Sequence, residues 1–286
     1  MKKLSLLLLA MLSLSLVNCK KDKSDDSSST VDDKKPVPVT VTSNENSSRI
    51  QNFPDLIIKQ ITGAQTKNPA TITTTTSNYE YNGRHTVKIT TNDGTDVTVA
   101  DYYYADMDNG ILDSIVYKKN SQFFEVDKFE VSNGHIQQII KYDANNNITQ
   151  KAIFSNYNGD TPQQISLYAM TAQGSMNLSG TVTYNGNDIV GLSTTGTLGQ
   201  NSLSMNITYN YDSKNNVFLN VETMDWPTAN EHNVISSTTE LNLSGMNFSK
   251  TTTYNYTYNS DDYPINETYT STDSSSGSSE YVYDDK

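Results

Sequence analysis

Alternation of apolar and polar side chains is the feature that most constrains the fold of this chain. Through residues 203–211 every second residue is Leu, Met, Ile or Tyr, and those between are Ser, Asn or Thr. Segments 241–243, 254–258 and 281–283 repeat the pattern over shorter spans. A period of two with one apolar face predicts β-strands that are exposed to solvent on one face. After residue 18 the best helical candidate is 55–64, whose isoleucines fit a strand as well.

An aromatic strand end, a polar turn and a β-branched restart recur along the chain. Six segments show this order: 79–89, 129–136, 142–148, 182–189, 209–217 and 256–265. Asn and Gly supply the turns because tight hairpins need positive φ. The tyrosine before each turn is expected to cover the sheet while its hydroxyl stays in water. The pattern predicts an all-β antiparallel hairpin meander forming a curved sheet, an open sandwich or an incomplete barrel.

The N-terminus predicts export and lipidation. Lys2 and Lys3 precede an apolar run, Leu4 to Leu16, that is too short to span a bilayer, so residues 1–18 are typical of a removable signal peptide. The tetrad 16–19, Leu-Val-Asn-Cys, resembles a lipobox and ends in Cys19, the chain's one cysteine. We therefore expect lipid attachment at Cys19, and a membrane partnership through that anchor. The alternative is a secreted protein in which Cys19 falls there by chance.

Composition divides the rest of the chain into a tether and one domain. Residues 19–48 contain almost nothing large and apolar, which predicts a disordered tether. Residues 49–286 are predicted to form a single all-β domain. Charged residues just after Cys19, including Asp22, resemble export signals of Bacteroidota lipoproteins, favouring the outer membrane facing the cell exterior; a periplasm-facing position is the alternative. The net charge of −12 makes nucleic acid a poor partner.

Two blocks of sequence carry a resemblance to a family. The Tyr-x-Tyr-(Asn/Asp) turns resemble the YD-type hairpins of RHS-like proteins. Segments 211–221 and 256–264, with His232-Asn233-Val234, are similar to uncharacterised Bacteroidota surface lipoproteins. Val217 and Asp262 depart from that pattern, which commonly has Pro and Gly there. The resemblance implies a fold and a location but no activity.

Candidate sites are few. His85, His135 and His232 lack metal-ligand spacing, and the turn 106–110 does not fit the register of a calcium loop, so we expect no metal and no cofactor. No catalytic motif appears, and no catalytic residue is predicted.

Two further residues are worth following. Trp226 is the candidate contact for a glycan or protein ligand, and the alternative is that it plugs one end of the β core. Ser114, in Asp-Ser-Ile, resembles an O-glycosylation site.

These observations predict a non-enzymatic envelope lipoprotein that is exposed at the surface and serves in binding, adhesion or scaffolding. Envelope assembly or lipid carriage is the first alternative, and it requires an apolar cavity inside the curved sheet. A carbohydrate-active hydrolase is the second, and it requires two carboxylates facing across a cleft.

Overall fold

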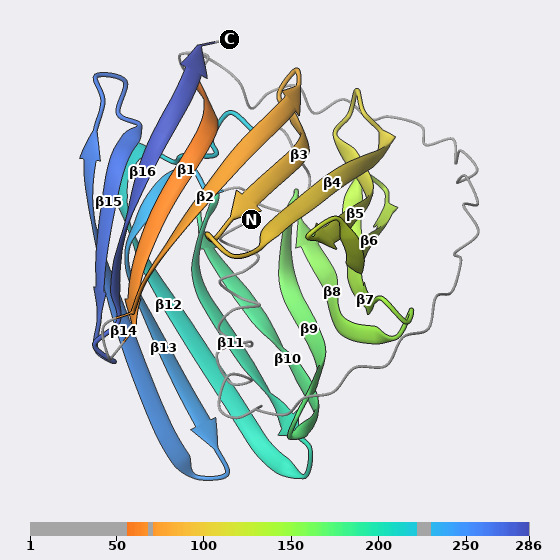
Figure 1. Cartoon of the computed structure of the whole chain (residues 1–286). Coiled ribbons are helices and arrows are strands. Elements are labelled where there is room, and N and C mark those ends of the chain that lie inside the picture. The colour runs from red at the N-terminus through yellow and green to blue at the C-terminus, as the bar shows by residue number, and fades with distance from the viewer. Residues whose placement is uncertain (1–55, 68–70, 222–229, 286) are drawn as a thin grey trace. The chain divides into compact units, whose positions relative to one another are not determined.

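Sixteen antiparallel strands form a closed barrel in the computed structural model, which describes residues 56–67, 71–221 and 230–285 (Figure 1). Within those ranges no helix is long and apolar enough to cross a bilayer. Each strand pairs with its neighbours in sequence, so the predicted all-β meander is confirmed. The strands are β1 Leu56–Lys67, β2 Thr71–Asn82, β3 His85–Asn92, β4 Val97–Asp106, β5 Ile111–Lys119, β6 Gln122–Ser132, β7 His135–Asp143, β8 Ile148–Asn158, β9 Thr161–Thr171, β10 Gly174–Asn185, β11 Asp188–Leu198, β12 Asn201–Asn215, β13 His232–Leu243, β14 Met246–Tyr258, β15 Pro264–Ser271 and β16 Ser276–Asp285.

Closure of the sheet overturns the predicted open sandwich or incomplete barrel. β1 pairs with β16 from Leu56↔Asp285 to Thr66↔Ser276, which joins the first strand to the last. A closed sheet leaves no edge whose N–H and C=O groups need other partners, and this is the physical advantage over the open forms.

The segment 55–64, whose isoleucines fit a helix or a strand, lies in β1 from residue 56 onward. A β-bulge explains the spacing of these isoleucines. The pairing with β16 shifts register between Ile58 and Gln60. The extra residue, Lys59, places Ile58 and Ile61 on the same face although they are three residues apart, and both are buried. A bulge therefore gives a strand the apolar spacing that usually indicates a helix.

Hairpin turns lie where the Asn- and Gly-bearing corners predicted them, with one exception. The tight turns include Asn133-Gly134 between β6 and β7 and Gly186 between β10 and β11, with positive φ at Asn133 and at both glycines. The fifth predicted hairpin, 209–217, is wrong as a tight turn. β12 runs on to Asn215, and a long connection separates it from β13.

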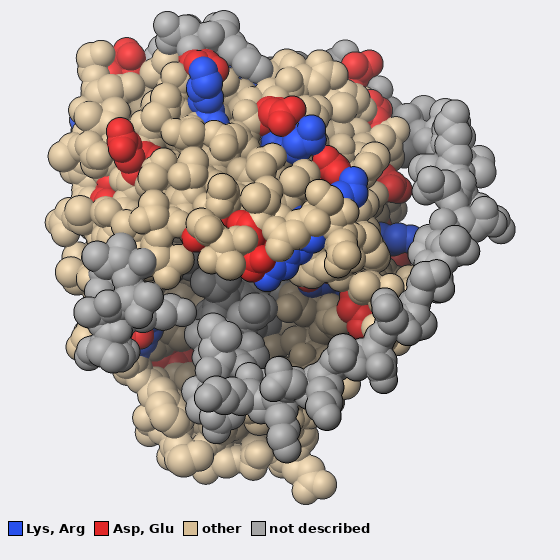
Figure 2. Space-filling model, viewed as in Figure 1, with Lys and Arg blue, Asp and Glu red and all other residues tan. Residues whose placement is uncertain are grey.

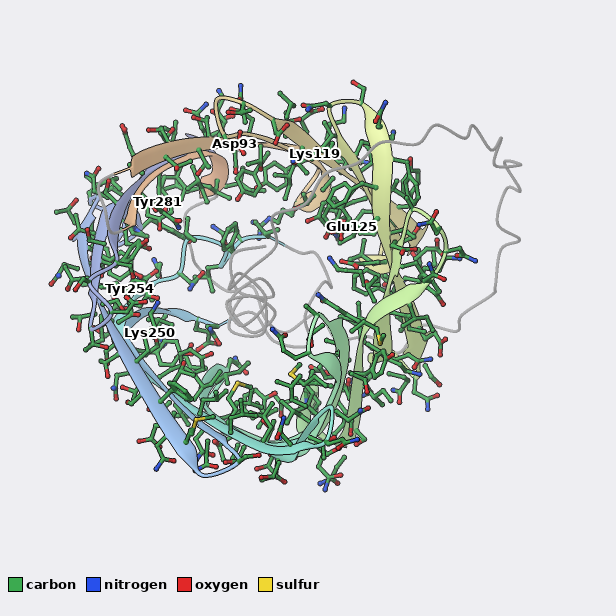
Figure 3. All side chains as sticks on the ribbon, turned by 60° about the horizontal axis from the view of Figure 1, so that its bottom comes forward. Asp93, Lys119, Glu125, Lys250, Tyr254 and Tyr281 are labelled. Atoms are coloured by element: carbon green, nitrogen blue, oxygen red, sulfur yellow. The ribbon has the colours of Figure 1, made fainter. Side chains whose placement is uncertain are left out.

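The wall has one buried face, and it is the inner one (Figure 3). Paired residues on neighbouring strands point to the same side. The pairs Ile61↔Tyr281, Ile89↔Ala100, Tyr102↔Ile115, Ala169↔Met176 and Leu192↔Ile207 all belong to this face. Every one of these side chains is buried.

Candidate functional site

The interior of the barrel is lined mainly by apolar side chains. Along β10 and β12, Met176, Leu178, Leu203, Met205 and Ile207 point inward, and each is at most 3% exposed. The residues between them, such as Asn177 and Ser179 on β10 and Asn206 on β12, are exposed. The two-residue period of the sequence thus sorts an apolar inner face from a polar outer face.

The number of strands sets the width of a barrel's interior, and this barrel has sixteen. A barrel of about eight strands has an interior just wide enough for side chains to meet, and barrels of about sixteen strands leave a channel. An inner face of Ile, Leu, Met and Tyr would gain little from a water-filled channel, since burial of apolar surface is what stabilises it. This arrangement suits an apolar occupant.

The outer face is the reverse of that in a barrel surrounded by lipid. Membrane-spanning barrels present an apolar band outward. On β2, β10 and β11 the outward residues are mostly Thr, Ser and Asn. Acids and bases are scattered over the visible face (Figure 2), and apolar side chains such as Tyr103, Ile153 and Val282 are exposed among the outward residues of other strands. Outward ion pairs join neighbouring strands, among them Lys118 to Asp101 at 2.9 Å and Lys88 to Glu80 at 3.6 Å. This surface favours contact with water.

At one end of the barrel, a ring of seven tyrosines forms hydrogen bonds between neighbouring strands, and we call each of these bonds a clamp. Each tyrosine lies near the last inward position of an even-numbered strand, and its hydroxyl donates to a backbone carbonyl of the preceding strand. The prediction that the hydroxyl before each turn stays in water is therefore wrong for the four of these tyrosines that lie in the predicted hairpins: Tyr81, Tyr184, Tyr211 and Tyr256. β6 carries Val131 at the corresponding position. The donors and acceptors are Tyr81 to Ile58, Tyr104 to Thr86, Tyr157 to Ile136, Tyr184 to Pro162, Tyr211 to Ile189, Tyr256 to Val234 and Tyr283 to Pro264.

The start of the β12–β13 connection, residues 216–221, packs against the inner wall. Val217, Phe218 and Val221 pack against the core cluster of Ile58, Ile61 and Tyr281. This segment narrows the interior at the tyrosine end of the barrel.

Asparagine side chains hold that segment in place. The Asn220 amide donates to the Leu56 carbonyl at 2.8 Å and to the Tyr263 hydroxyl at 2.9 Å. The Asn216 amide donates to the His232 carbonyl at 2.9 Å, and the Asn216 side-chain oxygen accepts from the Phe218 N–H at 3.0 Å. Asn216 and Asn220 are both buried, so their bonds replace those that water would make.

A charged cluster interrupts the apolar interior near the opposite end. Asp127 on β6 is paired directly with Lys141 on β7, which is paired with Gln150 on β8. Lys141 Nζ donates to Glu125 Oε1 at 2.8 Å and lies 3.5 Å from Asp127 Oδ1. It also lies 5.0 Å from the centre of the Tyr117 ring, a cation–π contact. Figure 3 shows Glu125 on the inner side of the wall.

The cluster has more negative than positive charge, and it is buried. Asp127 is 1% exposed. Burial raises the pKa of Asp127 to about 6, and this outweighs the attraction of Lys141. Burial alone lowers the pKa of Lys141, but Asp127 and Glu125 raise it overall. Both pKa values are therefore raised, which means that the cluster favours binding of an additional proton or positive charge.

Two acceptor atoms of this cluster make no hydrogen bond. Asp127 Oδ2 accepts from the Tyr117 hydroxyl at 3.1 Å, but Asp127 Oδ1 has only the ionic contact with Lys141. Gln150 Oε1 is also buried without a hydrogen-bond partner. A buried acceptor without a donor costs about 1–3 kcal/mol.

Both carboxylates of the cluster contact the same ammonium. Glu125 and Asp127 flank Lys141, so they do not form the pair facing across a cleft that the hydrolase alternative requires.

At the end where the cluster lies, β14 presents apolar side chains that are not covered. Phe248 is paired with Leu241, which is paired with the inward Met205, so Phe248 lies on the inner side. Phe248 is 55% exposed and Met246 is 57% exposed. This part of the inner wall is an accessible apolar surface.

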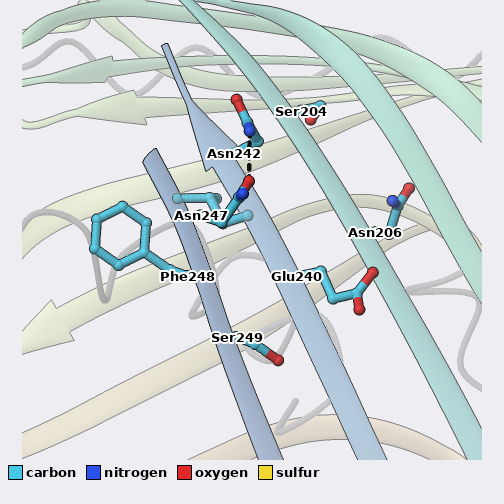
Figure 4. A pocket seen from close by; sticks show the side chains of 8 residues that line it. Ser204, Asn206, Glu240, Asn242, Asn247, Phe248 and Ser249 are labelled. Carbon is cyan, nitrogen blue, oxygen red and sulfur yellow. Dashed lines mark hydrogen bonds between the residues drawn. The ribbon is translucent and has the colours of Figure 1, made fainter. Parts of the chain in front are cut away.

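The outer wall carries a shallow depression over β12, β13 and β14, with a volume of about 320 Å³ (Figure 4). Its polar lining includes Asn206, Glu240, Asn242 and Asn247, and the Asn242 amide donates to the Asn247 side-chain oxygen. That volume is at the lower limit for a ligand pocket. We therefore take the interior as the candidate site.

The histidines singled out in the sequence lie apart. His232 Nδ1 is 2.6 Å from Asp188 Oδ2, the His135 ring stacks on Tyr157 at 4.5 Å, and the His85 ring lies 5.7 Å from that of Tyr104. Among the residues that the structure describes, no group of three or more His, Cys, Asp or Glu side chains could hold a metal ion.

The other singled-out residues have varied outcomes. In the 106–110 turn, the Asn109 N–H donates to Asp106 Oδ1. Ser114 is 8% exposed, which disfavours a glycan in the folded state. Cys19 and Trp226 lie outside the described residues, as do the predicted signal peptide and tether, and all of these stay predictions.

The sequence alone does not indicate the interior cluster formed by Glu125, Asp127 and Lys141. Between Phe123 and Phe129, both alternating faces contain apolar residues, so the pattern could not tell which face is inward. The detectable clue was the placement of Glu125 and Asp127 at every second position between two phenylalanines on the same face.

No protein-family model and no curated protein matches this chain. Among solved structures it is similar to a porin-like protein from Bacteroides uniformis ATCC 8492, at 12% identity and a TM-score of 0.49, covering 79% of this chain and 96% of that one. It is also similar to a porin-like protein from Bacteroides vulgatus ATCC 8482, at 12% identity and a TM-score of 0.44, covering 80% and 99%. Both likenesses are too distant to bear on function.

Proposed function

We propose that this chain is a non-enzymatic lipoprotein of the cell envelope whose barrel holds an apolar or amphipathic molecule in its interior. The observation that carries the proposal is the polarity of the wall: apolar inside and polar outside, around a ring of sixteen strands. It favours the lipid-carrier alternative over adhesion or scaffolding, because an adhesin has no need of a wide apolar interior.

The wall supplies two features that a carrier needs. Its outward Ser, Thr, Asn and charged residues are compatible with an aqueous compartment. Its exposed inward residues Met246 and Phe248 provide an apolar surface at the end opposite the tyrosine ring. Transfer of apolar surface from water to such a wall contributes about 25 cal/mol per Å².

The proposed location rests on the N-terminal sequence. Acylation at Cys19 would anchor the chain to the outer membrane, with the barrel facing the cell exterior; a periplasm-facing barrel is the alternative. Replacement Cys19→Ser should release the protein from membranes, and protease treatment of intact cells should degrade an exterior barrel while sparing a periplasmic one. Retention of the Cys19→Ser protein on membranes would contradict the anchor.

A binding experiment tests the carrier function. The chain without its leader, residues 19–286, is purified without detergent, and its organic extract is examined by mass spectrometry. We expect co-purified lipid, and saturable binding of a fluorescent fatty-acyl probe after the extract is removed and the protein refolded. An empty extract together with no probe binding would refute the proposal.

A matched pair of variants locates the binding surface. The double variant Met246→Ser/Phe248→Ser removes inward side chains that are already exposed, so folding should be little affected. Loss of their contact should weaken probe binding about tenfold. Its control, Asn247→Ser, changes the intervening outward residue and should bind like the parent. Equal binding by all three proteins would remove Met246 and Phe248 from the site.

A further inference from the structure

The charged cluster inside the barrel offers acceptors but no matching donor. Asp127 Oδ1 and Gln150 Oε1 are buried acceptor atoms without a hydrogen bond, and they belong to residues on β6 and β8 that flank the same lysine on β7. Lys141 cannot serve both carboxylates equally: it donates to Glu125 at 2.8 Å and stays 3.5 Å from Asp127 Oδ1. The missing group is therefore a donor.

The charge balance says which kind of donor fits. Glu125 and Asp127 bring two negative charges, and Lys141 brings one positive charge. A second cation would neutralise the cluster, whereas an anion would add to the imbalance in a place where charge is poorly solvated. Burial raises the pKa of Asp127, and a further cation beside the carboxylate would oppose that rise.

The residues that surround the charged cluster indicate the chemistry of the remaining part of the ligand. Ile115, paired directly with Asp127, and Ala169, paired directly with Gln150, are buried apolar residues of the same inner face. A molecule whose cationic end reaches the cluster would lay its remaining atoms along apolar wall.

We propose that Glu125, Asp127, Lys141 and Gln150 form the head-group site of the barrel, and that its ligand is an amphiphile with an ammonium head and an alkyl body. The ammonium donates to Asp127 Oδ1 and Gln150 Oε1, and the alkyl chain lies on the inner wall. This inference rests on the proposed carrier function and adds the chemical class of the cargo.

Three probes of equal chain length test the head group. The chain 19–286 is titrated with dodecylammonium, dodecanol and dodecanoate, each below its micellar concentration, by calorimetry or by displacement of the fluorescent probe. We expect dodecylammonium to bind at least about tenfold more tightly than dodecanol, and dodecanoate to bind most weakly, because hydrogen bonds to charged groups are the stronger ones. If dodecanoate binds as well as dodecylammonium, the head-group site is refuted.

Variants of the cluster make the test specific. Asp127→Asn keeps the shape and removes the charge; it should abolish the preference for dodecylammonium over dodecanol, while dodecanol binding stays the same. Gln150→Leu, which removes one acceptor, should reduce that preference in part. The control, Asp101→Asn, breaks the outward pair with Lys118 and should leave the preference intact. Should Asp127→Asn not fold, Glu125→Gln provides the same change of charge at a less buried position.

The outcomes separate the two proposals. If none of the three probes binds, the carrier function itself fails. If all three bind with similar affinity, the carrier function stands and the head-group site fails. If dodecylammonium is preferred but Asp127→Asn and Glu125→Gln keep the preference, the cluster is structural and the inference is wrong.

Discussion

The Tyr184 hydroxyl on β10 donates a 2.9 Å hydrogen bond to the Pro162 carbonyl on β9. Pro162 is buried and has no N–H, so its carbonyl is its only backbone group that can bond. The same relation joins Tyr283 to Pro264, at 2.7 Å. Each clamp ties an even-numbered strand to the strand before it, which explains why a tyrosine precedes so many of the turns.

Replacing Tyr184 with Phe should destabilise the barrel by about 1–2 kcal/mol, because the buried Pro162 carbonyl loses its donor while the ring is kept. Urea unfolding of the chain 19–286 would measure the change. The control is Tyr103→Phe, since Tyr103 points outward and is 49% exposed, and the change expected there is within about 0.5 kcal/mol. Equal effects at the two positions would mean that the clamp contributes nothing.

Alkaline pH should unfold the barrel through the same tyrosines. Burial raises the pKa of Tyr157 to about 12, and it raises the pKa of Tyr81 and Tyr211 further. A raised folded-state pKa gives stability that is complete below the unfolded value of about 10 and is lost as pH rises through the folded value. Stability should therefore fall from about pH 10 to 12. Tyrosinate absorbance near 295 nm should rise cooperatively with loss of β-sheet circular dichroism; gradual ionisation of the folded protein would contradict this.

Two glycines of the inner wall should tolerate no side chain. A Cβ on Gly196 of β11 would lie 1.8 Å from the Asn177 carbonyl oxygen, and one on Gly180 of β10 would lie 1.8 Å from that of Ser193. These obstacles are backbone atoms, so the strands would have to move apart, and Gly196→Ala should cost about 2 kcal/mol or more. Thermal melts of the chain 19–286 would detect the loss.

The matched control is Gly63→Ala on β1. A Cβ there meets nothing nearer than the Thr75 hydroxyl at 3.5 Å, an ordinary contact. Alanine at Gly63 should be neutral or slightly stabilising, because it restricts the unfolded chain. If Gly63→Ala and Gly196→Ala melt at the same temperature, close approach of the strands is not what selects glycine in this wall.

Local features of this fold could be predicted from the sequence because they depend on nearest neighbours. Alternation over 203–211 and turns such as Asn133-Gly134 involve only residues close in the chain. Closure could not be predicted in this way, since Ile61 meets Tyr281 across more than two hundred residues. The bulge at Lys59 further concealed β1, because it breaks the two-residue period where the seam forms.

The interior site was harder to foresee than the strands. Which face of β6 is inward depends on its pairing with β5, where Ile115 meets Asp127. Without that register, Glu125 and Asp127 are indistinguishable from solvated acids such as Glu130. The lipid-carrier alternative did anticipate an apolar inner surface, but the sequence did not indicate how many strands would surround it.

The seam between β1 and β16 gives the most direct test of the closed barrel. Thr62 and Glu280 are directly paired across it, and both point to the outer face. Cross-strand partners have Cα atoms about 4.5–5.5 Å apart, within the range that a disulfide can bridge. In a Cys19→Ser background, the variant Thr62→Cys/Glu280→Cys should therefore form an intramolecular disulfide on mild oxidation, and peptide mapping should identify it.

The control for the seam is Thr62→Cys/Ser276→Cys. Ser276 is paired with Thr66, four residues along β1, which places it about 13 Å from Thr62. This pair should stay reduced under the same oxidation. The Thr62–Glu280 cross-link should also raise stability, by roughly 5 kcal/mol at most, because it closes a loop that includes nearly the whole barrel. An open sheet would leave both pairs reduced, or would link them only between molecules, because its first and last strands would lie at separate edges.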